Sequence, residues 1–282
     1  MSEQLRIMAI VCHPADALDH AGGTLCLHAE RGDEVTVVVC THGVETHDLA
    51  RNESLSRGDD DIADLEKAIE GKEQEVVRGL EVLGVKDARF LRFPDDVVSV
   101  TQELLEAIAG QLAEVQPHLL IIHNPTEELG FGHTDSAQAV LKAVGLAHTP
   151  RFLQKKKKDG AFPVQIFFLA MYGHTNQLTS DGIRHGNVLV DITPVMDRKV
   201  QAMDCLKSQF YTGDLARKCV EITNGRMGLH ASIPYAESFQ TLHPDVYSHL
   251  PANEFLMSRS RTSRSELAKE MKVKVNEVPV LE

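Results

Sequence analysis

Hydrophobic and polar positions follow two different periods along the first two hundred residues. Short continuous apolar runs, which strands buried on both faces require, predict strands at 5–12, 34–41, 88–93, 118–124, 164–171 and 187–193. Apolar positions three and four apart predict helices at 21–31, 62–83, 101–115 and 133–144, and two later helices at 194–209 and 213–224. Because strands alternate with helices, the pattern favours βαβ units and a parallel sheet.

The alternation predicts an α/β fold: a Rossmann-like, mostly parallel sheet flanked by helices, with a C-terminal helical extension. We expect residues 1–255 to form one domain. Residues 256–282 begin with a stretch rich in Ser and Arg, and we expect a tail that is flexible or lies on a neighbouring subunit of a homo-oligomer. Polar residues dominate 46–60, which favours a mobile, lid-like loop there.

Composition and charge narrow the class of protein. The hydrophobic content of 43% and the charged content of 25% are ordinary globular values. The net charge of −12 argues against binding to a nucleic-acid backbone, although a locally positive pocket can still hold a small anionic substrate. The four lysines from Lys155 to Lys158 are expected to form a solvated loop.

The spacing of the cysteines and the lack of a signal-peptide pattern favour a cytoplasmic location. The five cysteines contain no C-x-x-C pair, so we expect buried, reduced thiols rather than disulfides. The N-terminal residues do not resemble a signal peptide, and no run of roughly 18 apolar residues occurs. We therefore expect a cytoplasmic protein without membrane contact.

Histidines and carboxylates follow four of the predicted strands. Ligands of open α/β sheets bind outside the carboxyl ends of the strands, so these segments should meet at one edge. His13 and Asp16 lie three residues apart in one turn, and His133 from a distant loop would complete a site of two histidines and one carboxylate. This open coordination is typical of catalytic Zn²⁺, with another divalent metal as the alternative. For His20, His28, His42 and His123 we expect surface or capping roles, with a role as substitute metal ligand as the alternative for each.

Several motifs resemble those of one enzyme superfamily. The segments His-Pro-Ala-Asp at 13–16, Ala-Gly-Gly-Thr at 21–24 and Thr-His-Gly at 41–43 are similar to the opening of the PIG-L/LmbE superfamily of zinc-dependent de-N-acetylases. The resemblance covers about residues 5–144 and implies His13, Asp16 and His133 as the zinc ligands. A rival match places Ser136 at the third ligand position and leaves the metal one ligand short.

The departures from the family pattern bear on the reaction. The family's general base is the first aspartate of His-Pro-Asp-Asp, and Ala15 occupies that position here. Gly130 occupies the position at which the family has the histidine that acts as the acid. Because the loss of one proton-transfer group costs about 10²–10⁴-fold in rate, we expect amide hydrolysis by the usual route to be slow.

The chain resembles the 4-oxalomesaconate hydratase branch of the superfamily, which has a similar pattern of missing groups. Segments 203–209 and 235–239 also resemble segments of that branch. We therefore expect a zinc-dependent hydratase, a lyase acting on a small unsaturated keto or enol carboxylic acid in aromatic compound degradation. Glu45 and His174 are the expected acid–base pair. The expected cations for substrate carboxylates are Arg51, Lys207 and Arg226.

Two other functions remain open at this point. One is de-N-acetylation of an amino sugar or similar amide, with Asp135 or Glu45 as an unconventional base. The other is a catalytically inactive family member that binds a ligand or partner.

Overall fold

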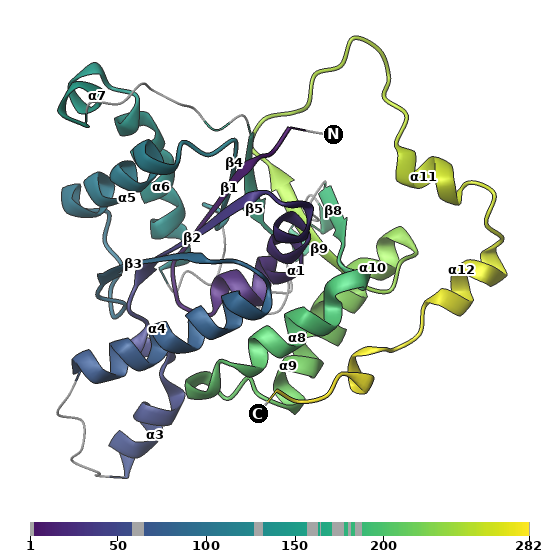
Figure 1. The fold of residues 1–282 in the computed structure, drawn as a ribbon, viewed down its shortest axis with the longest axis horizontal. Helices are drawn as coiled ribbons and strands as arrows, with labels where there is room; N and C mark the ends of the chain where they lie inside the picture. The colour runs from purple at the N-terminus through teal and green to yellow at the C-terminus, as the bar shows by residue number, and fades with distance from the viewer. Residues whose placement is uncertain are drawn as a thin grey trace.

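Seven strands form one sheet in the order β3-β2-β1-β4-β5-β9-β8 (Figure 1). In this computed structural model, β1 to β5 pair in parallel, whereas β9 runs antiparallel to both β5 and β8. The structure describes residues 3–57, 65–126, 132–156, 163, 165–170, 178–179, 182–183 and 188–281. The strands are β1 (Arg6–Val11), β2 (Glu34–Thr41), β3 (Asp87–Phe93), β4 (Leu119–Ile122), β5 (Gln165–Leu169), β8 (Val188–Asp191) and β9 (Ala236–Thr241), with a separate hairpin of β6 (Leu178–Thr179) and β7 (Gly182–Ile183).

Helices cover both faces of the sheet, with α5, α6 and α7 on one side and α1, α4, α8 and α9 on the other (Figure 1). The α-helices are α1 (Asp16–Arg31), α2 (Val44–His47), α3 (Leu49–Ser56), α4 (Leu65–Val82), α5 (Gln102–Val115), α6 (His133–Ala147), α7 (Pro150–Lys156), α8 (Met196–Asp204), α9 (Asp214–Cys219), α10 (Arg226–Ala231), α11 (Glu254–Arg259) and α12 (Arg264–Glu270). Short 3-10 turns are η1 (Thr193–Val195), η2 (Lys207–Gln209) and η4 (Val275–Glu277), and η3 (Val220–Gly225) is a π-helical turn.

Alternate residues of the central strands supply two hydrophobic cores. Ile7, Ala9 and Val11 of β1 pack with α1, α4 and α8, whereas Met8 and Ile10 pack with α5 and α6. Successive side chains of a strand point to opposite faces of the sheet, and here helices cover both faces. The sequence of β1 is therefore a continuous apolar run rather than an alternation of apolar and polar residues.

The predicted α/β fold with a mostly parallel sheet is confirmed. Five of the six predicted strands overlap β1 to β5, and the sixth overlaps β8. The strand β9 was not predicted. The predicted helix at 194–209 was wrong in extent: α8 ends at Asp204, because Leu206 leaves helical geometry with φ −84° and ψ 61°. The helix predicted to end at 224 continues through η3 into α10.

The described part of the segment predicted as a lid-like loop is helical. Residues 44–56 form α2 and α3, and the carboxylate of Asp48 caps α3 by accepting a hydrogen bond from the amide of Arg51 at 2.9 Å. Residues 58–60 of the predicted loop lie outside the described residues, as do Lys157 and Lys158 of the lysine run. The loop predicted for this run was wrong for Lys155 and Lys156, which end α7.

The end of the chain returns to the body of the molecule. Val275 and Val278 are buried in the core that contains α1 and α8, and the guanidinium of Arg217 donates to the carbonyl of Val278 at 2.8 Å. The division of the chain at residue 255 stays a prediction. Among the described residues, no helix combines the length and the apolar character that a membrane crossing requires.

Candidate metal centre

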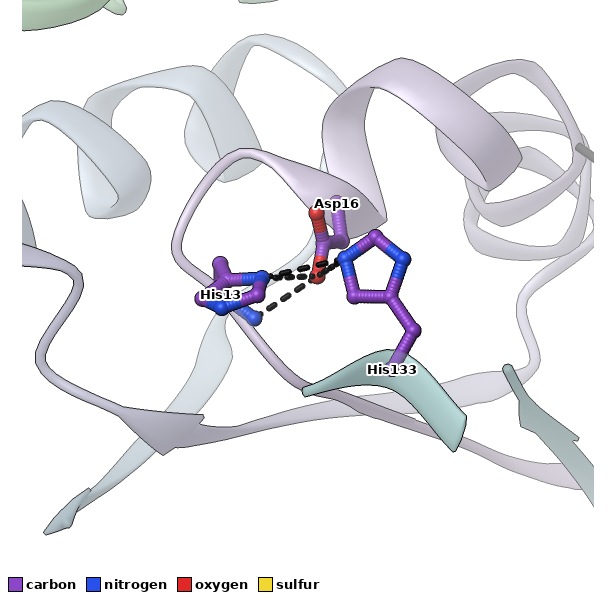
Figure 2. A group of neighbouring side chains, drawn as sticks. All are labelled: His13, Asp16 and His133. Atoms are coloured by element: carbon purple, nitrogen blue, oxygen red, sulfur yellow. Dashed lines mark hydrogen bonds and ion pairs between the residues drawn. The ribbon is translucent and has the colours of Figure 1, made fainter. Parts of the chain in front are cut away.

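Three side chains converge at the carboxyl edge of the sheet. His13 follows β1, Asp16 begins α1 and His133 begins α6 (Figure 2). His13 Nδ1 lies 3.0 Å from His133 Nε2 and 3.5 Å from Asp16 Oδ2, and His133 Nε2 lies 3.6 Å from the same oxygen. One ligand atom from each residue falls within 4.8 Å of the others, and all three residues are buried.

The order of the strands explains why these residues meet. β1 lies between β2 and β4, and the chain leaves β1 toward one face of the sheet and β4 toward the other. A crevice opens at such a switch point, beyond the carboxyl ends of the strands. Within the first turn, Asp16 folds back so that its Oδ2 accepts a hydrogen bond from the amide of His13 at 2.7 Å.

Gly132 allows the chain to turn tightly into α6 beside this crevice. Its φ of +83° lies in the left-handed region, which glycine occupies without steric cost. A Cβ at this position would lie 2.4 Å from Val98 Cγ2 and 3.2 Å from Cys12 Sγ. The chain therefore turns into α6 in a space where only a glycine fits, and His133 follows directly.

The protonation states favoured by the fold are those that a metal ion requires. Burial lowers the pKa of His13. Burial acts to raise the pKa of Asp16, but the neighbouring His133 and His123 hold it well below its usual value. A neutral imidazole and an ionised carboxylate are metal-binding forms. The donor set of two imidazole nitrogens and one carboxylate oxygen therefore fits a divalent cation such as Zn²⁺.

His123 lies inside this centre, so the expected surface or capping role was wrong. It is fully buried, and its ring stacks on that of His133 with centroids 4.0 Å apart. Its Nε2 lies 3.0 Å from Asp16 Oδ2 and 3.1 Å from the amide nitrogen of Cys12. One ring nitrogen serves only one of these contacts, as donor to the carboxylate or as acceptor from the amide.

Sequence reasoning missed His47 and Asp95. The ring of His47 lies against that of His13, with centroids 4.0 Å apart. The buried carboxylate of Asp95 accepts hydrogen bonds from the amides of Glu45 and Thr46 at 3.2 and 2.8 Å, and its Oδ1 lies 2.9 Å from His42 Nδ1. Burial acts to raise the pKa of Asp95, but hydrogen bonds from His47, Thr46 and the amide of Glu45 hold it below its usual value. Asp95 lies two residues after the end of β3, and the rule of searching beyond strand ends would have found it there.

The other predicted site residues lie outside the three-residue cluster. The Glu45 side chain is 43% exposed and lies 3.7 Å from Arg51 Nη1. Lys207 lines a pocket of about 410 Å³ together with Arg78 and Leu281. Arg226 lines another, of about 280 Å³, beside α10. His174 and Gly130 lie outside the described residues.

The two matches considered for the third ligand differ in geometry. His133 lies in the cluster, whereas Ser136 directs its hydroxyl toward Cys40 Sγ at 3.8 Å. Cys12, Cys26, Cys40 and Cys205 are buried, Cys219 is partly buried, and all five thiols are free. The reduced state of these cysteines stays a prediction.

A mostly parallel sheet with a His–Asp–His cluster at its switch point defines an LmbE-like α/β protein. Comparison with known families agrees: residues 8–144 match the GlcNAc-PI de-N-acetylase family, PIG-L. The resemblance seen in the motifs is therefore confirmed over these residues, which make up just under half of the chain.

Individual relatives include two kinds of enzyme. The chain is 26% identical over 260 residues to a 4-oxalmesaconate hydratase of Pseudomonas putida, an alignment that covers 88% of this chain and 93% of the relative. It is 25% identical over 253 residues to a diacetylchitobiose deacetylase of Thermococcus kodakarensis, covering 87% and 85%. The 4-carboxy-2-hydroxymuconate hydratase of Pseudomonas putida has the same fold, with a TM-score of 0.70, 20% identity, and coverage of 88% of this chain and 100% of that one.

Proposed function

We propose that this protein is a metal-dependent hydratase, a lyase that adds water to a small unsaturated keto or enol carboxylic acid resembling 4-oxalomesaconate. His13, Asp16 and His133 would hold the metal, with Zn²⁺ as the first candidate. The proposed setting is cytoplasmic degradation of aromatic compounds. De-N-acetylation is the second candidate.

The observation that carries the proposal is the side chain at position 15. Ala15 is the N-cap of α1 and is 4% exposed, between the proposed ligands His13 and Asp16. The family resemblance implies a general base there, and a methyl group cannot accept a proton. The cluster of potential ligands is thus kept, whereas the group that amide hydrolysis needs is absent.

Nearby polar groups suit an anionic substrate. The Arg51 side chain is only 16% exposed, and its Nη1 has no hydrogen-bond partner among the residues that the structure describes. A buried guanidinium nitrogen of this kind can bind a carboxylate strongly. A bound divalent cation would polarise a substrate oxygen as a Lewis acid. Glu45 and His174 remain the proposed proton-transfer pair, and Glu45 is the partner of Arg51 in the ion pair.

One observation favours the second candidate. Asp135 is exposed in the first turn of α6, two residues after His133. It lines a pocket of about 240 Å³ together with Thr46 and Gly132. A carboxylate at this place could replace the missing base in an amide hydrolysis.

Substitution of Ala15 distinguishes the two reactions. The metal-loaded wild-type enzyme and the variants Ala15→Asp and Ala15→Asn would be assayed in parallel. One assay follows the absorbance loss of a conjugated keto-acid substrate, and the other follows acetate release from N-acetyl amino sugars. Both polar residues are good N-caps, so Ala15→Asn controls for packing and capping without supplying a base.

We expect the wild type to hydrate the keto acid and to release little acetate, and Ala15→Asp to leave acetate release near the level of Ala15→Asn. Rapid acetate release by the wild type without hydration would overturn the proposal and direct attention to Asp135. A gain of about 10²-fold or more in acetate release, specific to Ala15→Asp, would indicate a decayed deacetylase. Neither reaction with metal bound would indicate an inactive binding protein.

A further inference from the structure

A buried lysine contacts the segment that carries His47. Lys72 of α4 is 2% exposed, and burial lowers its pKa. Its Nζ donates hydrogen bonds to the carbonyl of His47 and to the hydroxyl of Ser208, both at 3.0 Å. Both acceptors are neutral, and burial of an ammonium group against neutral partners costs folding stability. Packing alone therefore does not account for a lysine at this place.

Ser208 is itself fixed by Glu75, which follows Lys72 in α4. The Glu75 carboxylate accepts one hydrogen bond from the Ser208 amide at 2.9 Å and another from its hydroxyl at 2.7 Å. Because the hydroxyl proton points to Glu75, the Ser208 oxygen accepts the hydrogen bond from Lys72. Two elements, α4 and η2, thus hold the Lys72 ammonium in place where it meets α2.

The other end of α2 is bound by Asp95. Its carboxylate accepts hydrogen bonds from two successive amides of α2 at 3.2 and 2.8 Å, whereas Lys72 binds the carbonyl of the last residue. A Cβ on Gly43, the N-cap of α2, would lie 2.4 Å from Pro14 Cδ and 3.3 Å from Lys72 Cε. Because Pro14 directly follows His13, α2 is held at both ends against the turn that carries two of the proposed ligands.

We propose that Lys72 and Asp95 are positioning residues that hold α2 at the metal centre, an inference that rests on the proposed metal-dependent activity. The ring of His47 lies against that of His13, with centroids 4.0 Å apart, and the carbonyl that Lys72 binds belongs to the same His47. Groups beside a ligand imidazole set its orientation, and their loss typically costs about 10–100-fold in metal affinity or activity. Lys72 therefore acts on His13 through His47.

Stability separates a positioning role from a purely structural one. Lys72→Met keeps the length of the side chain and removes its charge and its hydrogen-bond donors. Because burial of a charge costs stability, we expect the midpoint of urea unfolding to change little or to rise. A purely structural role predicts the opposite: a protein that unfolds at lower urea and loses its function only together with its fold.

The first test is amide hydrogen exchange of the full-length protein, with and without zinc, which does not depend on the reaction catalysed. We expect Lys72→Met and Asp95→Asn each to speed exchange about 10-fold or more in peptides that cover α2, while β1 stays protected. Lys67→Met is the matched control, because Lys67 is an exposed lysine of the same helix. Asp95→Asn acts on the other end of α2, so it decides the test if Lys72→Met does not fold.

The second test measures zinc affinity, and kcat and KM for the reaction that the wild type catalyses, hydration or acetate release. We expect Lys72→Met to weaken zinc binding about 10–100-fold and to lower kcat at saturating zinc with KM nearly unchanged, and Lys67→Met to match the wild type.

Unchanged exchange over α2, or faster exchange with unchanged zinc affinity and kcat, would overturn the inference, as would a loss of stability that accounts for the loss of activity. A wild type that catalyses neither reaction would contradict the proposed function instead, and exchange and zinc affinity would then decide the inference.

Discussion

At the scale of single residues, Asp16 connects the proposed metal centre to the backbone that shapes it. Its carboxylate accepts a hydrogen bond from the amide of His13 and lies within 3.6 Å of His133 and 3.0 Å of His123. The same side chain therefore provides the only negative charge of the three-residue cluster and closes the turn that positions one of its histidines.

Asp16→Ala should lower zinc affinity by roughly 100-fold or more, because a ligand and the cluster's only anion are removed together. Asp19→Asn is the matched control: Asp19 is the other acidic residue in the first turn of α1, and an asparagine there can still accept the hydrogen bond from Tyr211. Elemental analysis after equilibration against a zinc buffer measures the outcome. Equal zinc content in the two variants would remove Asp16 from the proposed ligand set.

Single residues also show what the sequence alone could predict at this centre. Local spacing was sufficient to identify His13 and Asp16, which share one short turn, whereas His133 was identified from its place after a strand and from the family resemblance. His47 could not be placed in this way, and His123, directly after β4, was considered only as a substitute ligand. Their positions depend on stacking against His13 and His133, and such contacts arise only when separate loops meet in the folded chain.

At the scale of elements, α1 is held against the sheet by a buried polar contact. Glu237 of β9 accepts hydrogen bonds from the amides of Gly23 and Thr24 at 2.8 and 2.7 Å and pairs with Lys199 of α8 at 2.7 Å. Glu237 is 1% exposed and Lys199 is fully buried. This contact also explains why β9 was not predicted from the sequence, since a strand with a buried glutamate does not show the apolar run that identified β1 and β2.

Gly23→Ala should destabilise the protein by about 1–3 kcal/mol, the usual cost of overpacking a core. A Cβ at Gly23 would lie 2.6 Å from Ile192 Cγ2, so the helix or the chain that follows β8 would have to move. Gly71→Ala in α4 is the control, because its Cβ would meet nothing within 4 Å. We expect this change to stabilise by about 0.5–1 kcal/mol through helix propensity. Urea unfolding of both variants measures the difference, and a neutral Gly23→Ala would contradict the close contact.

At the scale of the whole molecule, the two ends of the sequence differ in how well they could be predicted. The first five strands follow one another as βαβ units, and the rules of handedness and burial leave few arrangements open. The antiparallel β8 and β9 are joined through three helices instead. The final residues reach their place through contacts distant in sequence, such as that between Arg217 and Val278, which local patterns do not contain.

The returning C-terminus should therefore contribute to the stability of the entire domain. Val275 and Val278 are 1% and 7% exposed, and the buried Asp204 accepts hydrogen bonds from Arg217 and from the amide of Leu281. Deletion of residues 274–282 removes both valines from the core and takes the Val278 carbonyl from Arg217 Nε and Nη2. We expect a loss of about 3–6 kcal/mol in the free energy of unfolding, because each fully buried valine contributes about 1.5–3 kcal/mol. Val280→Ser is the control, since Val280 is 51% exposed and a surface change usually stays within about 0.5 kcal/mol. Chemical denaturation of the three proteins provides the measurement, and a truncated chain as stable as the full one would show that these residues lie on the body without holding it together.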